Sequence, residues 1–370
     1  MAIPRYNWEH RDWPKFRYKI TELKNTFLQI FAKENYIINL SEKENKAEEF
    51  LNLIDLIATE AIKTAAIEGE FYSRKDVVSS IKKNLGVPQK AHKLQNKFAA
   101  NISNFTLAAR NSYAKPLSKV MLCQWHTILF ENHENIEIGN WRTHTEAMQI
   151  ISGAMGKEKV HFEAPASKTL ATEMKLFIKW FNDTAPDGDT PIKNAVVRAA
   201  IAHLYFLSIH PFEDGNGRIG RALAEKVFSQ AAGKPVLLCL SYAIEKEKKA
   251  YYTALQKAQQ HNEITPWLNY FTFTVYKAQL YTEKHLQFAL KQNTFLKKWN
   301  TLLNPRQLKV IKKILECGFE GFEGGMNAQK YIGITKASKA TATRDLQELQ
   351  NLKIFKVYGG GRSTRYGLVV

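Results

Sequence analysis

One segment of twelve residues concentrates the side chains that could carry out phosphate chemistry. It runs from His210 to Arg221 and reads HPFEDGNGRIGR. The imidazole of His210 titrates near neutrality in its ordinary state, so it could act as a general base. Gly215 and Gly217 let the backbone turn tightly and offer its N–H groups to an anion. The segment therefore predicts a loop that binds phosphate beside a proton acceptor.

The charged residues of this segment suit a polyphosphate. Arg218 and Arg221 are three residues apart, so they are neighbours on the first turn of a helix that begins near Arg218. Their planar guanidinium groups match phosphate oxygens better than lysine would. Asp214 supplies a hard oxygen ligand for Mg²⁺, which a polyphosphate usually brings. The alternative is a solvated glycine-rich turn between two helices, and so many specified residue types in twelve positions argue against it.

The elements that must position this loop are mainly helical. A helix over 191–209 is apolar on most faces, which predicts a place in the middle of a bundle. It should end at His210, because Pro211 disfavours helical geometry in the residue before it. Between 145 and 165 the pattern changes and predicts a short β-hairpin that serves as a flap. Other helices are predicted at 41–69, 73–86, 117–130, 167–181, 243–260 and 267–296.

The loop resembles the signature of the Fic family, H-P-F-x-D/E-G-N-G-R-x-x-R, which residues 210–221 match in full. Residues from about 117 to 280, including the hairpin, look like the rest of a Fic core. The resemblance implies a mainly α fold, a Fic-type helical bundle with a β-hairpin flap. It also implies a protein adenylyltransferase that moves AMP from ATP to a Ser, Thr or Tyr hydroxyl of a target protein (AMPylation), with Mg²⁺ as cofactor.

The same resemblance implies roles for individual residues. His210 would remove the proton of the target hydroxyl, and Asp214 would hold Mg²⁺. The residues expected to bind the nucleotide phosphates are Gly215, Asn216, Gly217, Arg218 and Arg221. Tyr251 and Tyr252 resemble a tyrosine pair that the family places near the nucleotide. The flap residues expected to clamp the target as an added strand are Ser152, Gly153, Val160, His161 and Phe162.

The donor and the direction of the reaction stay open. A few Fic relatives move phosphate, UMP or phosphocholine, and the intact pair of Arg218 and Arg221 favours a nucleoside triphosphate.

Upstream, residues 64–69 read TAAIEG and fit the family's inhibitory motif [ST]-x-x-x-E-[GN]. Glu68 could pair with Arg221 and occupy the place of the γ-phosphate. It could instead orient water for the reverse, de-AMPylating reaction, and the plain alternative is a helix that ends at Gly69.

The two ends of the chain carry further patterns. Trp8, Trp13, Pro14 and Phe16 resemble an accessory region of some long Fic proteins, although core aromatic residues of a small helical domain would look the same. At the other end, helices at 304–315, 327–332 and 338–352 precede strands at 354–358 and 365–369. This order is typical of a winged helix-turn-helix domain. The residues expected to contact DNA are Ser338, Lys339, Thr341, Arg344, Arg362 and Arg365.

Charge and composition set the remaining expectations. The chain has 370 residues and a net charge of +18, and the segment from Lys297 onward holds fourteen Lys and Arg residues against five Asp and Glu residues, a net charge of +9. Double-stranded DNA is therefore an expected partner beside ATP and the target protein, although winged helices also bind proteins. The competing function is a DNA-binding transcriptional regulator whose Fic core senses a nucleotide.

We predict three domains: an N-terminal helical region at 1–110, a catalytic core at 111–296 and the winged helix at 297–370. Three cysteines without a C-x-x-C pair and the lack of an apolar run of membrane-spanning length predict a cytoplasmic protein without a membrane partner. A homodimer is compatible with the sequence and not required by it.

Overall fold

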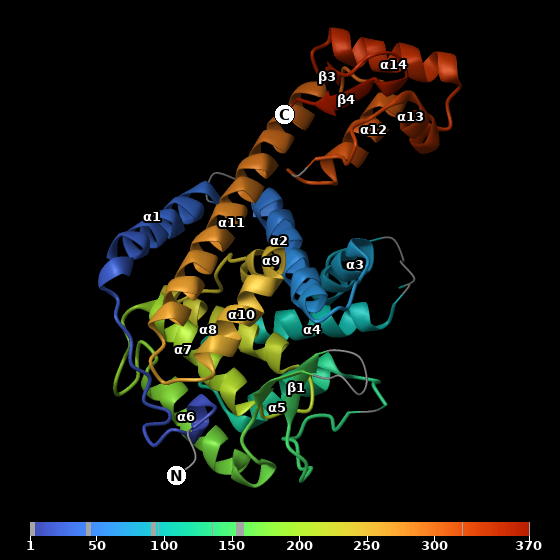
Figure 1. Ribbon diagram of the computed structural model, residues 1–370. Helices are drawn as coiled ribbons and strands as arrows, with labels where there is room; N and C mark the ends of the chain where they lie inside the picture. Colours follow the sequence, from blue (N-terminus) through green and yellow to red (C-terminus); the bar gives the residue numbers. More distant parts are fainter. Residues whose placement is uncertain are drawn as a thin grey trace. The chain divides into compact units, whose positions relative to one another are not determined.

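The computed structural model describes residues 4–41, 46–89, 94, 96–134, 136–152, 159–319 and 321–369, apart from the side chains of a few of them. The chain divides into two compact units, Met1–Tyr36 with Ala47–Thr282, and Ile37–Lys46 with Glu283–Val370. The chain passes from one unit to the other after Tyr36, after Lys46 and after Thr282. The last of these points lies within the long helix α11 (Thr265–Trp299), which is labelled in Figure 1. We refer to the two compact units as unit 1 and unit 2.

Two helices at the centre of unit 1 carry the signature loop between them. Helix α7 (Ala195–Ile209) is buried at every residue from Val196 to Ile209, as expected for the middle of a bundle. The side chain of Asn194 caps it by accepting hydrogen bonds from the first free N–H groups. Helix α8 (Asn216–Ala232) begins directly after the loop. The predicted central helix and its end at His210 are both confirmed.

The helices around this pair agree largely with those predicted. Most ends differ by a few residues, as helix ends commonly do. The start predicted at Ser41 is wrong, because Ser41 is the last residue of the preceding helix and the next one begins at Lys46. The segment predicted at 243–260 is divided into two helices. In chain order the helices are α2 (Lys46–Ile67), α3 (Arg74–Asn84), α5 (Lys119–Leu129), α6 (Leu170–Asp183), α9 (Leu240–Lys246) and α10 (Lys248–Ala258). The sequence analysis identified neither α1 (Lys24–Ser41) nor α4 (Phe98–Asn111). Lys97 makes no side-chain cap at the start of α4, but the side-chain oxygen of Asn96 accepts a hydrogen bond from the Phe98 N–H at 2.9 Å, a start signal that the sequence analysis did not use.

The predicted flap is a two-stranded antiparallel hairpin of β1 (Gln149–Ser152) and β2 (Lys159–Glu163). The register shifts between Ile150 and Ile151, so His161 has no residue opposite it and β2 carries a bulge. Gly153, one of the predicted flap contacts, lies outside the described residues. Short 3-10 turns cover Asn7–Glu9, Thr21–Leu23, Ser167–Thr169 and Gly361–Ser363.

Unit 2 contains three short helices followed by a second hairpin. Asn304, Asn327 and Ser338 each cap the next helix through a side-chain oxygen. These helices are α12 (Pro305–Leu315), α13 (Ala328–Thr335) and α14 (Lys339–Asn351), and the strands are β3 (Phe355–Tyr358) and β4 (Arg365–Leu368). The order of elements is the predicted one. Among the described residues, no helix is both long enough and apolar enough to cross a membrane.

Candidate active site

The signature loop is closed by its own side chains. The side-chain oxygen of Asn216 accepts a hydrogen bond from the Phe212 N–H at 3.0 Å, and its amide nitrogen donates to the Phe212 carbonyl at 2.7 Å. Gly215 takes the left-handed conformation with φ +79°, and a Cβ there would lie 2.6 Å from the ring of Phe130. The side chain of Asn216 thus shapes the loop, and what it can offer a phosphate is the backbone N–H at the start of α8.

His210 lies at the end of α7 in the left-handed conformation, with φ 53°. Its Nδ1 lies 3.3 Å from the carbonyl oxygen of Leu207. Because a carbonyl only accepts, this contact places the proton on Nδ1 and leaves Nε2 with a free lone pair. Burial lowers the pKa of His210 to about 4. The sequence analysis expected a value near neutrality, but the lower pKa still gives the neutral imidazole that a base requires.

The two loop arginines are almost completely buried, each about 2% exposed. Arg221 donates to the hydroxyl of Thr64 at 2.8 Å and to a carboxylate oxygen of Glu68 at 2.8 Å. Arg218 donates to a carboxylate oxygen of Glu70 at 2.8 Å and to Asp214 at 3.2 Å. Within the described part of the chain, Nε of Arg218 and Nη1 of Arg221 are buried without a hydrogen-bond partner. Buried unpaired donors are costly, so both positions favour an anionic ligand.

Glu68 lies directly over the loop. A Cβ added at Gly217 would come within 2.4 Å of the Glu68 carboxylate and 3.2 Å of Arg221 Nη1. The carboxylate therefore occupies the position where a helix N-terminus and a guanidinium would receive a phosphate. The hydroxyl of Tyr252 lies 3.5 Å from the same carboxylate. The structure thus brings the predicted inhibitory residue to the arginine with which the sequence suggested it could pair.

Asp214 is suited to a cation shared with a polyphosphate. One of its carboxylate oxygens accepts the N–H of Gly215 at 2.5 Å, and its side chain is 54% exposed. Among the described residues, His, Cys, Asp and Glu form no group of three or more that could hold a metal ion. A single exposed carboxylate fits Mg²⁺, which keeps most of its waters and takes further oxygens from phosphates.

The two predicted nucleotide tyrosines differ in position. Tyr251 is 1% exposed and its hydroxyl contacts Nε2 of His203 at 2.8 Å. Burial raises the pKa of the Tyr251 hydroxyl and lowers that of His203 to about 4, so both groups stay neutral. Tyr252 is 39% exposed and lies beside Glu68. Tyr252 is therefore the member of the pair that can meet a ligand.

The flap residues also divide into two kinds. The side chain of Phe162 is 1% exposed and packs edge-on against Tyr6, with ring centroids 5.1 Å apart. Phe162 can therefore offer a target only its backbone. Val160 is half-buried, and the carbonyl of His161 accepts a hydrogen bond from Gln256 of α10 at 3.5 Å. Ser152 ends β1 opposite Lys159.

Two residues of this site were missed by the sequence analysis. Arg142 is buried, and its Nε donates to the His210 carbonyl at 2.9 Å while its Nη2 donates to the Pro165 carbonyl at 2.5 Å. It thereby joins the loop to the base of the flap, and no local motif marks it. Glu70, the partner of Arg218, directly follows the inhibitory motif. Its position next to that motif places it near the loop, but the sequence does not show that Arg218 is its partner.

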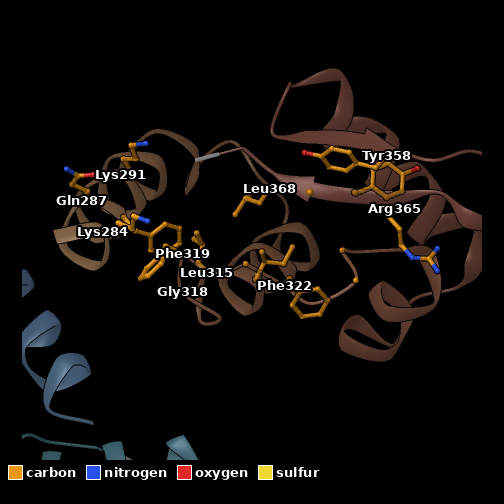
Figure 2. Close-up of a pocket in the computed structure, with 17 residues that line it drawn as sticks. Lys284, Gln287, Lys291, Leu315, Gly318, Phe319, Phe322, Tyr358, Arg365 and Leu368 are labelled. Carbon is orange, nitrogen blue, oxygen red and sulfur yellow. The ribbon is translucent and has the colours of Figure 1, made fainter. Parts of the chain in front are cut away.

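The residues predicted to contact DNA lie in unit 2. Lys339 and Arg344 are exposed, whereas Ser338 and Thr341 are engaged in the cap of α14. Arg365 lies at one end of an open groove of about 740 Å³. Its guanidinium points away from Leu315, another residue that lines the groove (Figure 2). The other labelled side chains of the groove are Lys284, Gln287, Lys291, Phe319, Phe322, Tyr358 and Leu368. The side chain of Arg362 lies outside the described set.

The fold of the chain is shared with solved Fic structures. A Fic family protein from Desulfovibrio desulfuricans G20 aligns with 95% of this chain and 97% of its own, with a TM-score of 0.52 and 18% identity. A Fic domain containing signaling protein from Bacteroides thetaiotaomicron VPI-5482 aligns with 72% of this chain and 96% of its own, also with a TM-score of 0.52 and 18% identity. The chain therefore has a mainly helical, Fic-type fold.

Family comparisons agree with this fold. Residues 116–228 match the Fic/DOC family, so the chain contains a Fic/DOC domain. Residues 6–87 match a domain of unknown function, DUF4172. The protein adenylyltransferase fic-1 of Caenorhabditis elegans is 25% identical over 262 residues, which are 69% of this chain and 46% of the relative. Its namesake from Caenorhabditis briggsae is 25% identical over 212 residues, 56% of this chain and 37% of the relative. The chain spans less than half the length of these relatives.

Proposed function

We propose that unit 1 is a protein adenylyltransferase that transfers AMP from ATP to a Ser, Thr or Tyr hydroxyl of a target protein. The observation that carries the proposal is the pair of buried arginines, Arg218 and Arg221, each with an N–H that has no partner among the described residues, in the same loop as the neutral imidazole of His210. The names of the fic-1 relatives support the same activity.

In the proposed reaction the target hydroxyl oxygen attacks the α-phosphorus of ATP. Nε2 of His210 accepts the hydroxyl proton, since Nδ1 carries a proton toward Leu207. The bond from the α-phosphorus to the bridging oxygen breaks, and pyrophosphate leaves with the electron pair. Arg218 and Arg221 stabilise the negative charge that collects on the leaving group. When bound through Asp214, Mg²⁺ would add positive charge beside the polyphosphate.

We further propose that the structure is that of an autoinhibited state. Glu68 pairs with Arg221, and Glu70 pairs with Arg218. Both arginines are therefore partly neutralised by residues at the end of α2 and just beyond it. ATP must displace these carboxylates before its phosphates can reach the guanidinium groups in a geometry that suits in-line attack. Removal of the Glu68 carboxylate should activate transfer.

Mass spectrometry of the purified chain tests this function. We expect Glu68→Gly protein incubated with Mg²⁺ and ATP to gain AMP on one of its own hydroxyls, and incubation with GTP, UTP and CTP identifies the preferred donor. His210→Ala in the same background should gain nothing. Loss of AMP from this modified protein when chain that retains Glu68 is added without ATP would show the reverse reaction. Equal modification with and without His210 would refute the mechanism.

A second function is favoured by the outward face of α14. We propose that α12–α14 with β3 and β4 form a winged helix-turn-helix domain that binds double-stranded DNA. The first three turns of α14 expose Lys339, Thr343, Arg344 and Gln347. These side chains donate to phosphates and to base edges in a major groove.

The two acidic residues of this helix, Asp345 and Glu348, both accept hydrogen bonds from α12. Asp345 is 2% exposed and accepts hydrogen bonds from Arg306 and from the hydroxyl of Tyr331, both at 2.9 Å. Glu348 accepts from Gln307 at 2.8 Å. Between residues 339 and 347, all of them described, the exposed side chains include no carboxylate, whereas Glu348, the next residue, is exposed. A cationic, donor-rich helix face matches the phosphates of a duplex.

Fluorescence anisotropy with a duplex of mixed sequence tests DNA binding. We expect affinity that falls steeply as salt rises and that is lost in Lys339→Ala/Arg344→Ala, with Lys312→Ala/Lys313→Ala on α12 as the matched control. No binding at low salt would contradict the proposal and favour a protein partner. Full DNA binding with no AMP transfer would favour a regulator whose Fic core senses nucleotide.

A further inference from the structure

The N-terminal segment of unit 1 contacts the flap directly. The indole Nε1 of Trp8 donates a hydrogen bond to the carbonyl of Glu163, at the end of β2, over 2.8 Å. The ring of Tyr6 packs edge-on against Phe162 and stacks on Trp8. These residues form a hydrophobic cluster of their own, separate from the main core of unit 1, together with Ala164, Met148 and Ile150. The apolar side of the flap is therefore covered by Tyr6 and Trp8.

The same segment is tied to the helix that carries the catalytic histidine. Asn7 is fully buried, and its side chain donates to the hydroxyl of Ser208 at 2.8 Å, two residues before His210. The Asn7 N–H donates to the Gln259 carbonyl at 2.7 Å. The side chain of Gln259 in turn donates to the carbonyl of Leu207 at 3.2 Å, and this carbonyl is the one that orients the His210 ring.

A two-stranded hairpin has little stability of its own, so its position depends on what it packs against. The side chain of Phe162 faces Tyr6, and the backbone at Glu163 is held by Trp8. A target strand added to the flap takes its place relative to His210 from the position of β2. An error of about 1 Å in the distance from a hydroxyl to the reacting phosphorus is enough to slow transfer about a hundredfold.

We propose that residues 6–8 are positioning residues for AMP transfer. They hold the flap at a fixed place relative to His210, so that an extended target segment presents its hydroxyl to the α-phosphorus. This inference rests on the proposed adenylyltransferase function. It gives a role to the first residues of the domain of unknown function matched over 6–87.

Trp8→Phe in a Glu68→Gly background is the test variant, because it keeps an aromatic ring and removes the donor to Glu163. Trp13→Phe is the matched control, since Trp13 donates from its indole to Glu173 at 2.9 Å and does not contact the flap through that bond. We measure self-modification with labelled ATP, the affinity for ATP, and hydrogen exchange of residues 159–163.

For Trp8→Phe we expect kcat to fall and exchange in 159–163 to accelerate, each about fivefold, the effect of one lost hydrogen bond. The KM for ATP should stay unchanged, because the phosphate loop is untouched. Trp13→Phe should alter neither kcat nor exchange in β2. Equal behaviour of the two variants would overturn the inference and leave residues 6–8 as ordinary packing.

Two other outcomes are distinguishable. If the Glu68→Gly parent transfers no AMP to any residue, the proposed function fails and the role of this segment in it fails as well. If the parent transfers AMP and Trp8→Phe changes exchange in β2 without changing kcat, the segment holds the flap but does not position the acceptor, which also overturns the inference.

Discussion

Replacing Glu68 by glutamine keeps the shape of the side chain and removes its charge. The carboxylate is 25% exposed and its partner Arg221 is 1% exposed, so the pair is shielded from solvent on one side. A hydrogen bond to a charged group of this kind contributes about 1.5–3 kcal/mol. ATP must replace it, and each ~1.4 kcal/mol corresponds to a factor of ten. We therefore expect Glu68→Gln to raise the rate of AMP transfer by roughly 10- to 150-fold.

The assay is transfer of label from α-labelled ATP to the chain, at ATP concentrations below saturation. Glu49→Gln is the control, because Glu49 is exposed on the same helix and carries the same charge. It should leave the rate unchanged within about twofold, as surface substitutions do. Equal rates for the Glu68→Gln protein and the parent would refute the reasoning that this carboxylate competes with the nucleotide.

Other predictions follow from the same contacts. Glu70→Gln should tighten ATP binding by a few-fold, measured by titration calorimetry, because its carboxylate is 31% exposed and its ion pair is more screened. Asp214→Asn should raise the Mg²⁺ concentration needed for half-maximal rate about tenfold or more; an unchanged requirement would exclude Asp214 as the ligand. Burial lowers the pKa of His210 to about 4, so rates at pH 6 and pH 8 should agree, whereas a base with the ordinary pKa of about 6.5 would lose roughly three quarters of its rate at pH 6. Burial raises the pKa of Glu60 to about 8, so the stability it contributes is complete below its unfolded pKa and is lost as pH rises toward 8. Glu60→Gln should remove this slope, at most ~1.4 kcal/mol per pH unit, from chemical unfolding curves.

Local chemistry explains what could be predicted from the sequence. Asn304, Asn327 and Ser338 begin helices as expected, because a cap depends only on residues a few positions away. The end of α7 followed from Pro211 for the same reason. The loop from His210 to Arg221 was identified because all of its functional side chains lie within one continuous segment of the sequence.

Long-range contacts explain what could not be predicted. Arg142 donates a hydrogen bond to the carbonyl of His210, which is 68 residues away in the sequence. Arg218 pairs with Glu70, which is 148 residues away. Neither spacing has a local signature. Tyr251 faces His203 in the core, although its neighbour Tyr252 is half-exposed, and only the packing of α10 decides which of the two turns inward. The winged-helix role of unit 2 and its DNA contacts stay predictions.

The central claim is that the loop seats a triphosphate for attack at the α-phosphorus, with Nε2 of His210 as the base. Parallel single-turnover reactions of the Glu68→Gly chain with α-labelled and γ-labelled ATP test it most directly. The account predicts that α label appears on the protein, that γ label appears in pyrophosphate, and that His210→Ala abolishes both. Label from the γ-phosphate on the protein, or undiminished transfer in His210→Ala, would contradict it.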